Sequence, residues 1–407
     1  MLSIARTIVA IDPAAPGPKW RLSAALVDWA SHLSFETEFA EKLALNKEAL
    51  AIVQPLLAAN PSPSAQEIVA DRLSAVGWLN DLVQRYDIAK PAYEESLELL
   101  LLAEKDSRAL SVQSSLAGVF GLLGNLAVKM GDKPAAVQNA EKAVGIRRKI
   151  LTINPERGGQ TGLAYSLSEL GTAYQANGQF EQALRARREE MVIWRKLLET
   201  SQSPGMDNER LSKSLLTTAH TATLANDIPF AQASYREGLD RLRATYATDP
   251  VFHRRQLEYS LSSYAKAAGT PPELKLSLLE ERVVLLRDTN DPAALAGAIF
   301  DLARARRDGG QTSAGLADFA EGLAIIDTVI ADQPGGVPAH RTAAHAAFDV
   351  ARMTGAGNDW RRALAAIEAW RAADTAFEGG AAMLAEVQSQ LSADAPPADQ
   401  SSQGGEP

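Results

Sequence analysis

A pair of glycines in the second half of the chain has the spacing of a phosphate-binding loop. Gly310 and Gly315 enclose four residues, as the two glycines of such a loop do. The loop also needs a lysine directly after the second glycine, and Leu316 stands there instead. The segment follows a helical pattern, whereas a phosphate loop follows a strand. We therefore do not expect a nucleotide site here.

A second glycine pattern lies nearer the N-terminus. Gly118, Gly121 and Gly124 recur at every third position, without the strand that precedes a dinucleotide-binding turn. We interpret these glycines as sites of close helix packing, with a locally weak helix as the alternative.

The five histidines form neither a metal-binding nor a catalytic pattern. His340 and His345 are five residues apart, whereas two ligands on one helical face are four apart. No nucleophile elbow accompanies them. Neighbouring glutamates lie among basic residues, which is typical of a solvated helix face; the pairs are Glu94–Glu95, Glu189–Glu190 and Glu280–Glu281. The sequence predicts a protein without catalytic residues, metal ions or cofactors.

Composition argues against further classes of function. There is no cysteine, which excludes disulfides, thiolate metal sites and a cysteine nucleophile. The formal net charge of −9 argues against a nucleic-acid binder, which normally has a basic stripe. No apolar run approaches the roughly 18 residues of a membrane span. Residues 1–11 are interrupted by Arg6, so we interpret them as a helix and not as a signal sequence. We expect a cytoplasmic protein that contacts neither membranes nor nucleic acids.

Internal repetition organises the chain. A polar residue followed by proline closes successive apolar helical patterns, roughly 42 to 49 residues apart, and proline disfavours helix in the residue before it. These pairs begin at Asp12, Asn60, Asn154, Ser203, Asp249, Asp291 and Gln333, and Asp106 fills the remaining gap without a proline. Each interval holds two amphipathic segments joined by a small turn, so we predict a series of helical hairpins.

The clearest copy of the repeat runs from Leu167 to Leu184. Its signature residues are Leu170, Gly171, Tyr174, Gly178 and Ala183. This order resembles the tetratricopeptide repeat, in the longer form of kinesin light chains and many bacterial signalling proteins. In that signature Gly171 and Ala183 are the small residues where the two helices of a hairpin cross closely. The resemblance implies an all-α fold, a right-handed α-solenoid of about eight antiparallel hairpins.

A separation of twelve residues between two small side chains recurs in other copies. It separates Gly124 from Ala136, Ala219 from Ala231 and Ala351 from Ala363. Leu302–Ala314 is a weaker copy, and those near Trp29–Ala40, Trp78–Pro91 and Ser262–Leu274 are weaker still. Pro134 and Pro229 stand in the first turn of predicted second helices, where proline is tolerated. A non-repeating helical bundle with coincidental spacing is the alternative.

Two predicted second helices carry basic residues near their ends, at Arg147–Lys149 and at Arg195–Lys196. Cations at a helix C-terminus complement the helix dipole. A capping role is therefore a sufficient explanation.

The repeat pattern divides the chain into four parts. Residues 1–15 match the second half of an incomplete repeat, and residues 16–375 form the tetratricopeptide-like array. Residues 376–391 are predicted to be a closing helix over the last apolar face, and residues 392–407 a disordered tail. Because the pattern starts within a second helix, our hypothesis is that the chain is the C-terminal part of a longer protein, or that its annotated start lies too far downstream.

By analogy with the family, the first helix of each hairpin lines the concave side of the superhelix. The predicted peptide-binding residues are Asn125, Lys129, Tyr165, Glu169, Thr172, Gln175, Lys213, Thr217, His220, Tyr259, Ser263 and Lys266. This polar and aromatic lining suits an extended peptide or a helix. The family's clamp for a C-terminal carboxylate is not found, because Gly121 stands where its lysine is expected.

The resemblance implies a non-catalytic scaffold that binds a peptide or protein partner in its concave groove. The alternative is a sensor or regulatory C-terminal segment of a bacterial signalling protein such as a serine/threonine kinase. A helical-repeat RNA binder would need a period of about 35 residues and a basic groove, and the chain has neither.

Overall fold

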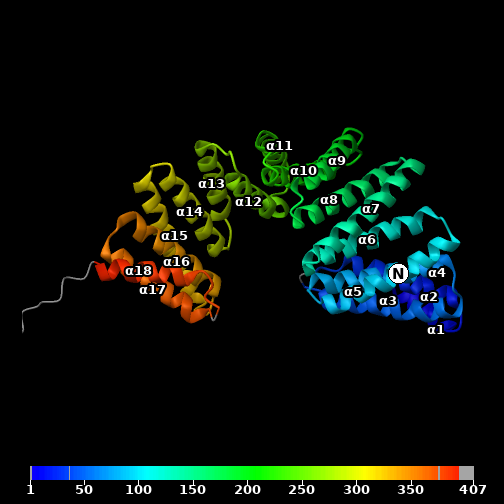
Figure 1. Cartoon of the computed structure of the whole chain (residues 1–407). Helices are drawn as coiled ribbons and strands as arrows, with labels where there is room; N and C mark the ends of the chain where they lie inside the picture. The colour runs from blue at the N-terminus through cyan, green and yellow to red at the C-terminus, as the bar shows by residue number, and fades with distance from the viewer. Residues whose placement is uncertain (1, 36, 375, 394–407) are drawn as a thin grey trace, which may run out of the picture. The chain divides into compact units, whose positions relative to one another are not determined.

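The computed structural model describes residues 2–35, 37–374 and 376–393, and these residues form eighteen α-helices and no strand (Figure 1). The predicted all-α fold is confirmed. The helices are α1 (Leu2–Ile11), α2 (Pro16–His32), α3 (Phe39–Ala59), α4 (Pro63–Leu82), α5 (Tyr86–Asp106), α6 (Leu110–Met130), α7 (Lys133–Ile153), α8 (Arg157–Ala176), α9 (Phe180–Glu199), α10 (Pro204–Leu224), α11 (Ile228–Thr248), α12 (Pro250–Lys266), α13 (Pro272–Arg287), α14 (Pro292–Asp308), α15 (Thr312–Asp332), α16 (Val337–Thr354), α17 (Gly357–Ala373) and α18 (Gly380–Ala393).

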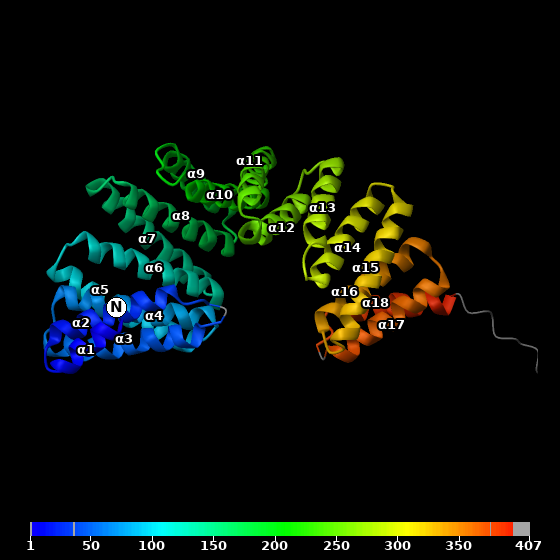
Figure 2. The same cartoon turned by 180° about the vertical axis from the view of Figure 1, so that it is seen from behind.

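The helices belong to two compact units, Met1–Arg241 (unit 1) and Leu242–Pro407 (unit 2), with the division inside α11. From α1 to α10 in unit 1, and from α12 to α18 in unit 2, each helix packs on the one that follows it (Figure 2). The helices pair into eight hairpins, α2–α3 through α16–α17, so the described part of the chain has the predicted number of hairpins. We call the earlier helix of each hairpin its first helix.

Small residues sit where the two helices of a hairpin meet. A Cβ added at Gly124 of α6 would lie 3.3 Å from the carbonyl oxygen of Ala136 in α7. This contact is tighter than most Cβ contacts, and the backbone of α7 cannot easily move away from it. A Cβ at Gly315 of α15 would lie 3.0 Å from the carbonyl oxygen of Ala303 in α14. Glycine costs roughly 1 kcal/mol within a helix, and this close approach is the reason to keep it.

This geometry corrects the frame of two weaker copies. In α14–α15 the buried small pair is Ala303 and Gly315, one residue after the predicted Leu302–Ala314. In α4–α5 the pair is Gly77 and Ala89, because a Cβ at Gly77 would lie 3.3 Å from the carbonyl oxygen of Ala89. Both pairs keep the twelve-residue separation.

The pairs of a polar residue and proline have two different roles at the helix ends. Asn60 and Asn154 end α3 and α7, as predicted. Asp249 and Asp291 instead begin the next helix, because their carboxylates accept hydrogen bonds from the backbone of the first turn, at 3.1 Å in α12 and 2.9 Å in α14. Proline follows each of these caps in the first turn, where its missing N–H has no helical partner to lose.

Successive second helices are joined by ion pairs along their exposed sides. The pairs are Arg148–Glu189 (2.7 Å), Arg195–Glu237 (2.5 Å), Arg243–Glu281 (2.6 Å) and Arg287–Glu321 (2.7 Å). Two of the predicted capping cations therefore bind the neighbouring hairpin, and Glu281 is paired and not simply solvated. Each partly exposed pair contributes about 1 kcal/mol or less, so the pairs align the hairpins more than they stabilise them.

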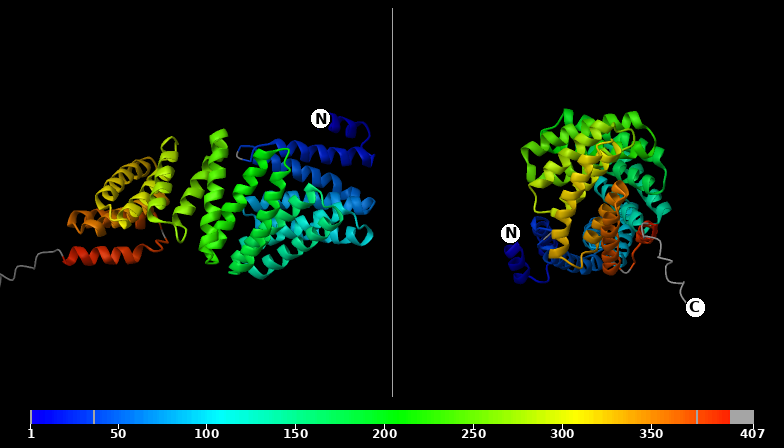
Figure 3. Two further views of the ribbon diagram at one scale, coloured as in Figure 1. Left: turned by 90° about the horizontal axis from the view of Figure 1, so that it is seen from above. Right: turned by 90° about the vertical axis from the view of Figure 1, so that its left-hand side faces the viewer.

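The two ends of the series are single helices. Helix α1 packs on α2 through Ala5 and Val9. Helix α18 packs on α17 and buries Met383 and Val387, at the position predicted for a closing helix (Figure 3). Of the predicted tail, residues 394–407 lie outside the described residues.

Helix α6 is long and apolar enough to cross a membrane, an outcome that the sequence analysis did not anticipate. Half of its apolar stretch is buried inside unit 1, where Leu116 and Leu126 are fully enclosed. A core helix of a repeat protein meets the same criteria of length and composition. We assign α6 to the core of unit 1.

Candidate binding surface

Nine of the predicted binding residues lie on three consecutive first helices of unit 1, α6, α8 and α10. We call them the first-helix face; they are Asn125, Lys129, Tyr165, Glu169, Thr172, Gln175, Lys213, Thr217 and His220. None of them is buried. Tyr165, Thr172 and Lys213 are exposed, whereas Glu169 and Gln175 are half-buried.

Four of the nine residues of this face join one hairpin to the next. The amide of Asn125 donates to Glu169 at 3.2 Å, which ties α6 to α8. The hydroxyl of Thr221 donates to Gln175 at 3.1 Å, which ties α10 to α8. Lys129 forms a 2.7 Å ion pair with the buried carboxylate of Asp81 in α4. These side chains hold the first helices in register. Three of the remaining members are exposed and form no hydrogen bond with another side chain of the described residues: Tyr165, Lys213 and His220.

Glu169 lies over a gap in the neighbouring helix. Gly121 of α6 leaves that gap, because a Cβ there would lie 3.0 Å from the carboxyl carbon of Glu169. Burial raises the pKa of Glu169 to about 7, although the hydrogen bond from Asn125 and the charge of Arg147 both lower it. Glu169 therefore titrates near neutral pH, which its residue type alone does not predict.

The three glycines of α6 have three different surroundings. The prediction that all three are sites of close helix packing is therefore too simple. Gly124 faces the backbone of α7 and Gly121 makes room for Glu169. A Cβ at Gly118 would meet no atom within 4 Å. Close helix packing is therefore confirmed only for Gly124.

Gly171 also makes room for a side chain and not for a backbone. A Cβ there would lie 2.8 Å from Cγ of Arg187 in α9. Arg187 is buried beside Glu190 at 3.9 Å, and it donates to the hydroxyl of Thr172 at 3.1 Å. The prediction of a solvated face is thus wrong for Glu190, which lies in the interior as half of an ion pair.

Three exposed members of the face are a tyrosine, a lysine and a histidine. Tyr165 is 49% exposed and meets Trp194 edge to face, with 5.4 Å between ring centroids. His220 lies one repeat after Thr172, and burial together with the nearby Arg187 charge lowers its pKa, so its ring is neutral at pH 7. Lys213 has no ion pair within the described part of the chain.

The other three predicted residues belong to unit 2. Tyr259 is 71% exposed on α12, and Ser263 is half-buried one turn further on. Lys266 forms a 2.9 Å ion pair with Asp301 of α14. They repeat the pattern of unit 1, with one exposed aromatic residue and one charged residue that joins two first helices.

The sequence of helices α8 and α9 is similar to a known protein family. Residues 163–204 match the family described as the tetratricopeptide repeat. This hairpin is a tetratricopeptide repeat. It contains Gly171, Tyr174 and Ala183, on which the sequence prediction rests, so that prediction is confirmed.

Several solved structures match the chain, and the first of the following three is similar to it in fold. A signal transduction ATPase with numerous domains and a tetratricopeptide repeat sensor, from Pyrococcus horikoshii, is 13% identical with a TM-score of 0.51; the match covers 81% of this chain and 46% of that one. A putative kinesin light chain of Podospora anserina is 20% identical with a TM-score of 0.42, over 54% of this chain and 98% of that one. A Rap protein complexed with competence and sporulation factor is 13% identical with a TM-score of 0.44, over 79% and 78%. No curated protein matches the chain.

Proposed function

We propose that the chain is a non-catalytic scaffold whose first-helix face in unit 1 holds a peptide or a helix of a partner protein. A cytoplasmic location and independence from cofactors, metals, membranes and nucleic acids belong to the same proposal.

The observation that carries the proposal is that the first-helix face contains two groups of residues, one that joins neighbouring helices and one that is exposed. Asn125, Glu169 and Gln175 are engaged between helices, which fixes the spacing of α6, α8 and α10. Tyr165, Lys213 and His220 stand exposed on that rigid support. An exposed tyrosine, a lysine and a neutral imidazole on helices whose spacing is fixed are typical of a recognition surface.

The test is affinity capture from the native host with the whole chain and with the triple variant Tyr165→Ala, Lys213→Ala, His220→Ala. None of the three side chains lies in the core, so the variant should fold, with a small loss of stability from the Tyr165–Trp194 contact. We expect proteins that the wild type enriches to be lost or depleted about tenfold, because removing aromatic and charged contacts costs more than 1 kcal/mol at a recognition site.

The matched control is the double variant Lys149→Ala, Val192→Ala, which removes exposed residues from second helices α7 and α9. It should capture the same partners as the wild type. Equal capture by the triple variant would contradict the proposal for this face. Capture that is lost only in the control would move the binding surface to the second helices.

A second candidate is the sensor or regulatory segment of a bacterial signalling protein. The archaeal ATPase with a tetratricopeptide repeat sensor has a similar fold, and this chain spans less than half of its length. The two candidates differ in what lies beside the array. A reading frame that encodes a catalytic domain directly upstream of Met1 would favour the sensor, and an unrelated neighbouring frame would favour the scaffold alone.

A further inference from the structure

A cavity of about 570 Å³ opens on the first helices of unit 2. It is lined by Arg282, Gly297, Phe300, Asp301, Arg304, Arg341, Thr342, His345 and Asp349, from α13, α14 and α16. Its volume lies within the range of roughly 300 to 1,000 Å³ that is usual for sites of small ligands. The sequence analysis named none of these residues as a site.

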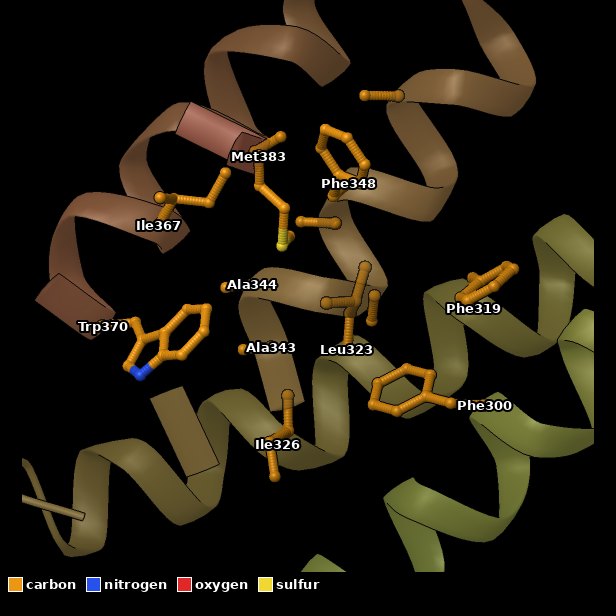
Figure 4. Close-up of a cluster of buried hydrophobic side chains, with 14 of the residues drawn as sticks. Phe300, Phe319, Leu323, Ile326, Ala343, Ala344, Phe348, Ile367, Trp370 and Met383 are labelled. Atoms are coloured by element: carbon orange, nitrogen blue, oxygen red, sulfur yellow. The ribbon is translucent and has the colours of Figure 1, made fainter. Parts of the chain in front are cut away.

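The floor of the cavity is fixed by the core of unit 2. Phe300 is fully buried and stacks on Phe319 with 6.0 Å between ring centroids, while Trp370 is buried close by (Figure 4). The His345 ring lies on Trp370 at 5.6 Å. Because these aromatic side chains are buried and closely packed, the floor of the cavity is set by the core of unit 2.

Most of the charges around the cavity neutralise one another. Arg282, with its side chain only 12% exposed, binds Glu258 at 2.8 Å and Asp301 at 2.8 Å. Arg304 binds Asp349 at 2.7 Å. The same two aspartates also hold Lys266 and Arg307, at 2.9 and 3.0 Å. Each carboxylate on the wall is therefore shared by at least two cations.

Arg341 is the exception. It is exposed at the cavity and, among the described residues, has no carboxylate within 4 Å. His345 adds no charge, because burial and the charges of Arg304 and Arg341 lower its pKa and leave the ring neutral at pH 7. The wall thus carries a guanidinium that forms no ion pair with the described residues, within a chain whose net charge is −9. The backbone N–H of Ala376 lowers the pKa of the Asp374 carboxyl most, and the charge of Arg341 also helps to lower it.

We infer that this cavity binds a singly charged carboxylate, with Arg341 as its charge partner. A guanidinium presents two parallel N–H donors that match the two oxygens of a carboxylate. The N–H of the neutral His345 ring supplies a further donor beside it. A monocarboxylate matches this one guanidinium, whereas a dianion such as phosphate carries a second negative charge for which the described residues of the wall offer no further cation without an ion pair. The group could be carried by a free organic acid or by an acidic side chain of a peptide.

Gly297 allows the cavity to be filled without disturbing the fold. It lines the cavity within α14, and a Cβ there would meet no atom within 4 Å. Gly297→Leu should therefore occupy the space with an apolar side chain, and it should stabilise the helix because leucine favours helix over glycine. Loss of binding in this variant cannot be attributed to unfolding.

The whole chain is titrated at constant ionic strength with four probes. N-acetylglutamine amide, whose α-carboxyl is also amidated, is the neutral probe. Acetate, N-acetyl-glutamic acid amide (a monocarboxylate) and inorganic phosphate are the anions. Binding is followed by calorimetry and by tryptophan fluorescence, since Trp370 contacts His345. We expect saturable binding of the monocarboxylates, weaker binding of phosphate and none of the neutral amide. Arg341→Gln and Gly297→Leu should each weaken the monocarboxylates about tenfold or more, the usual effect of losing a hydrogen bond to a charged group.

Arg255→Gln is the matched control. Arg255 is exposed on α12 of the same unit, has no ion pair within the described residues and does not line the cavity. This variant removes the same charge and should leave binding unchanged.

A short peptide with one glutamate distinguishes the two sources of the carboxylate, a free organic acid and a peptide side chain. Displacement of the peptide by the free acid, or binding of either one alone, supports the inference. No saturable monocarboxylate binding, tighter binding of phosphate, or equal weakening by Arg255→Gln would overturn it. None of these results depends on the partner captured by unit 1.

Discussion

At the scale of single residues, the unexpected feature of this protein is how many ionisable groups lie inside a helical array. Arg187 and Glu190 are buried together, and Glu169 is half-buried beneath Asn125. Placing a charge in such surroundings is costly unless it is paired or neutralised. Arg187 and Glu190 are paired, whereas Glu169 reduces the cost by keeping a proton.

The pH dependence of stability should report this proton. Glutamate has an ordinary pKa of 4.5, and burial raises that of folded Glu169 to about 7. Between the two values the folded protein holds a proton that the unfolded chain has lost. The stability that this proton supplies is complete below about pH 4 and is lost as the pH rises through about 7.

Glu169→Gln keeps a neutral side chain of the same shape at every pH. We expect the variant and the wild type to melt at similar temperatures at pH 5. At pH 8 the variant should be more stable, by about 1 to 2 kcal/mol after allowance for partial solvent access. Thermal unfolding at both pH values measures this. Gly121→Ala places a methyl group against the carboxylate, so in that background the stability gained by Glu169→Gln at pH 8 should be smaller. If the stability difference between Glu169→Gln and the wild type were the same at pH 5 and pH 8, the raised pKa of Glu169 would be contradicted.

At the scale of the element, the glycines within helices are of two kinds. At some of them a Cβ would collide with a neighbouring helix, and at others a Cβ would meet nothing. Gly171 is required, because a Cβ would displace Arg187. Gly145, within α7, is exposed and would meet no atom within 4 Å. The same substitution should therefore have opposite effects at the two positions.

Gly171→Leu should destabilise unit 1 by about 3 kcal/mol or more, because it forces Arg187 out of its site and leaves Glu190 buried without a partner. Gly145→Leu should be neutral or stabilising by up to about 1 kcal/mol, from helix propensity alone. Urea denaturation of both variants compares them directly. If Gly171→Leu were as stable as Gly145→Leu, the packing of Arg187 against α8 would be wrong.

At the scale of the whole molecule, each of the two compact units has hydrophobic clusters of its own. In unit 2 the largest one joins α14 to α18 through Phe300, Phe319, Ile367 and Trp370 (Figure 4). In unit 1 Leu163 and Leu167 join α8 to the preceding hairpin. Repeat arrays are stabilised mainly by contacts between neighbours, so damage should stay within a unit.

Phe300→Ala should cost about 3 to 5 kcal/mol, the usual price of an emptied aromatic core site. We expect amide hydrogen exchange to accelerate in α14 to α17, while the helices of unit 1 keep their protection. Leu167→Ala should give the reverse pattern. Acceleration spread evenly over both units in either variant would show that the chain unfolds as one cooperative body.

The sequence alone determined the class of fold, the eight hairpins and the absence of any complete catalytic motif. It could do so because small residues twelve positions apart and prolines at helix ends act locally, within one hairpin. Only the tertiary structure showed that Ala303–Gly315 and Gly77–Ala89 are the true frames of two weaker copies, since neighbouring small residues look equivalent until the helices meet. It also decided which charges face one another. Arg148 lies about one repeat from Glu189 in the sequence, and Asn125 lies about one repeat from Glu169. Arg341 is about as far from the cavity residues of α14. These distances are bridged only when hairpins stack.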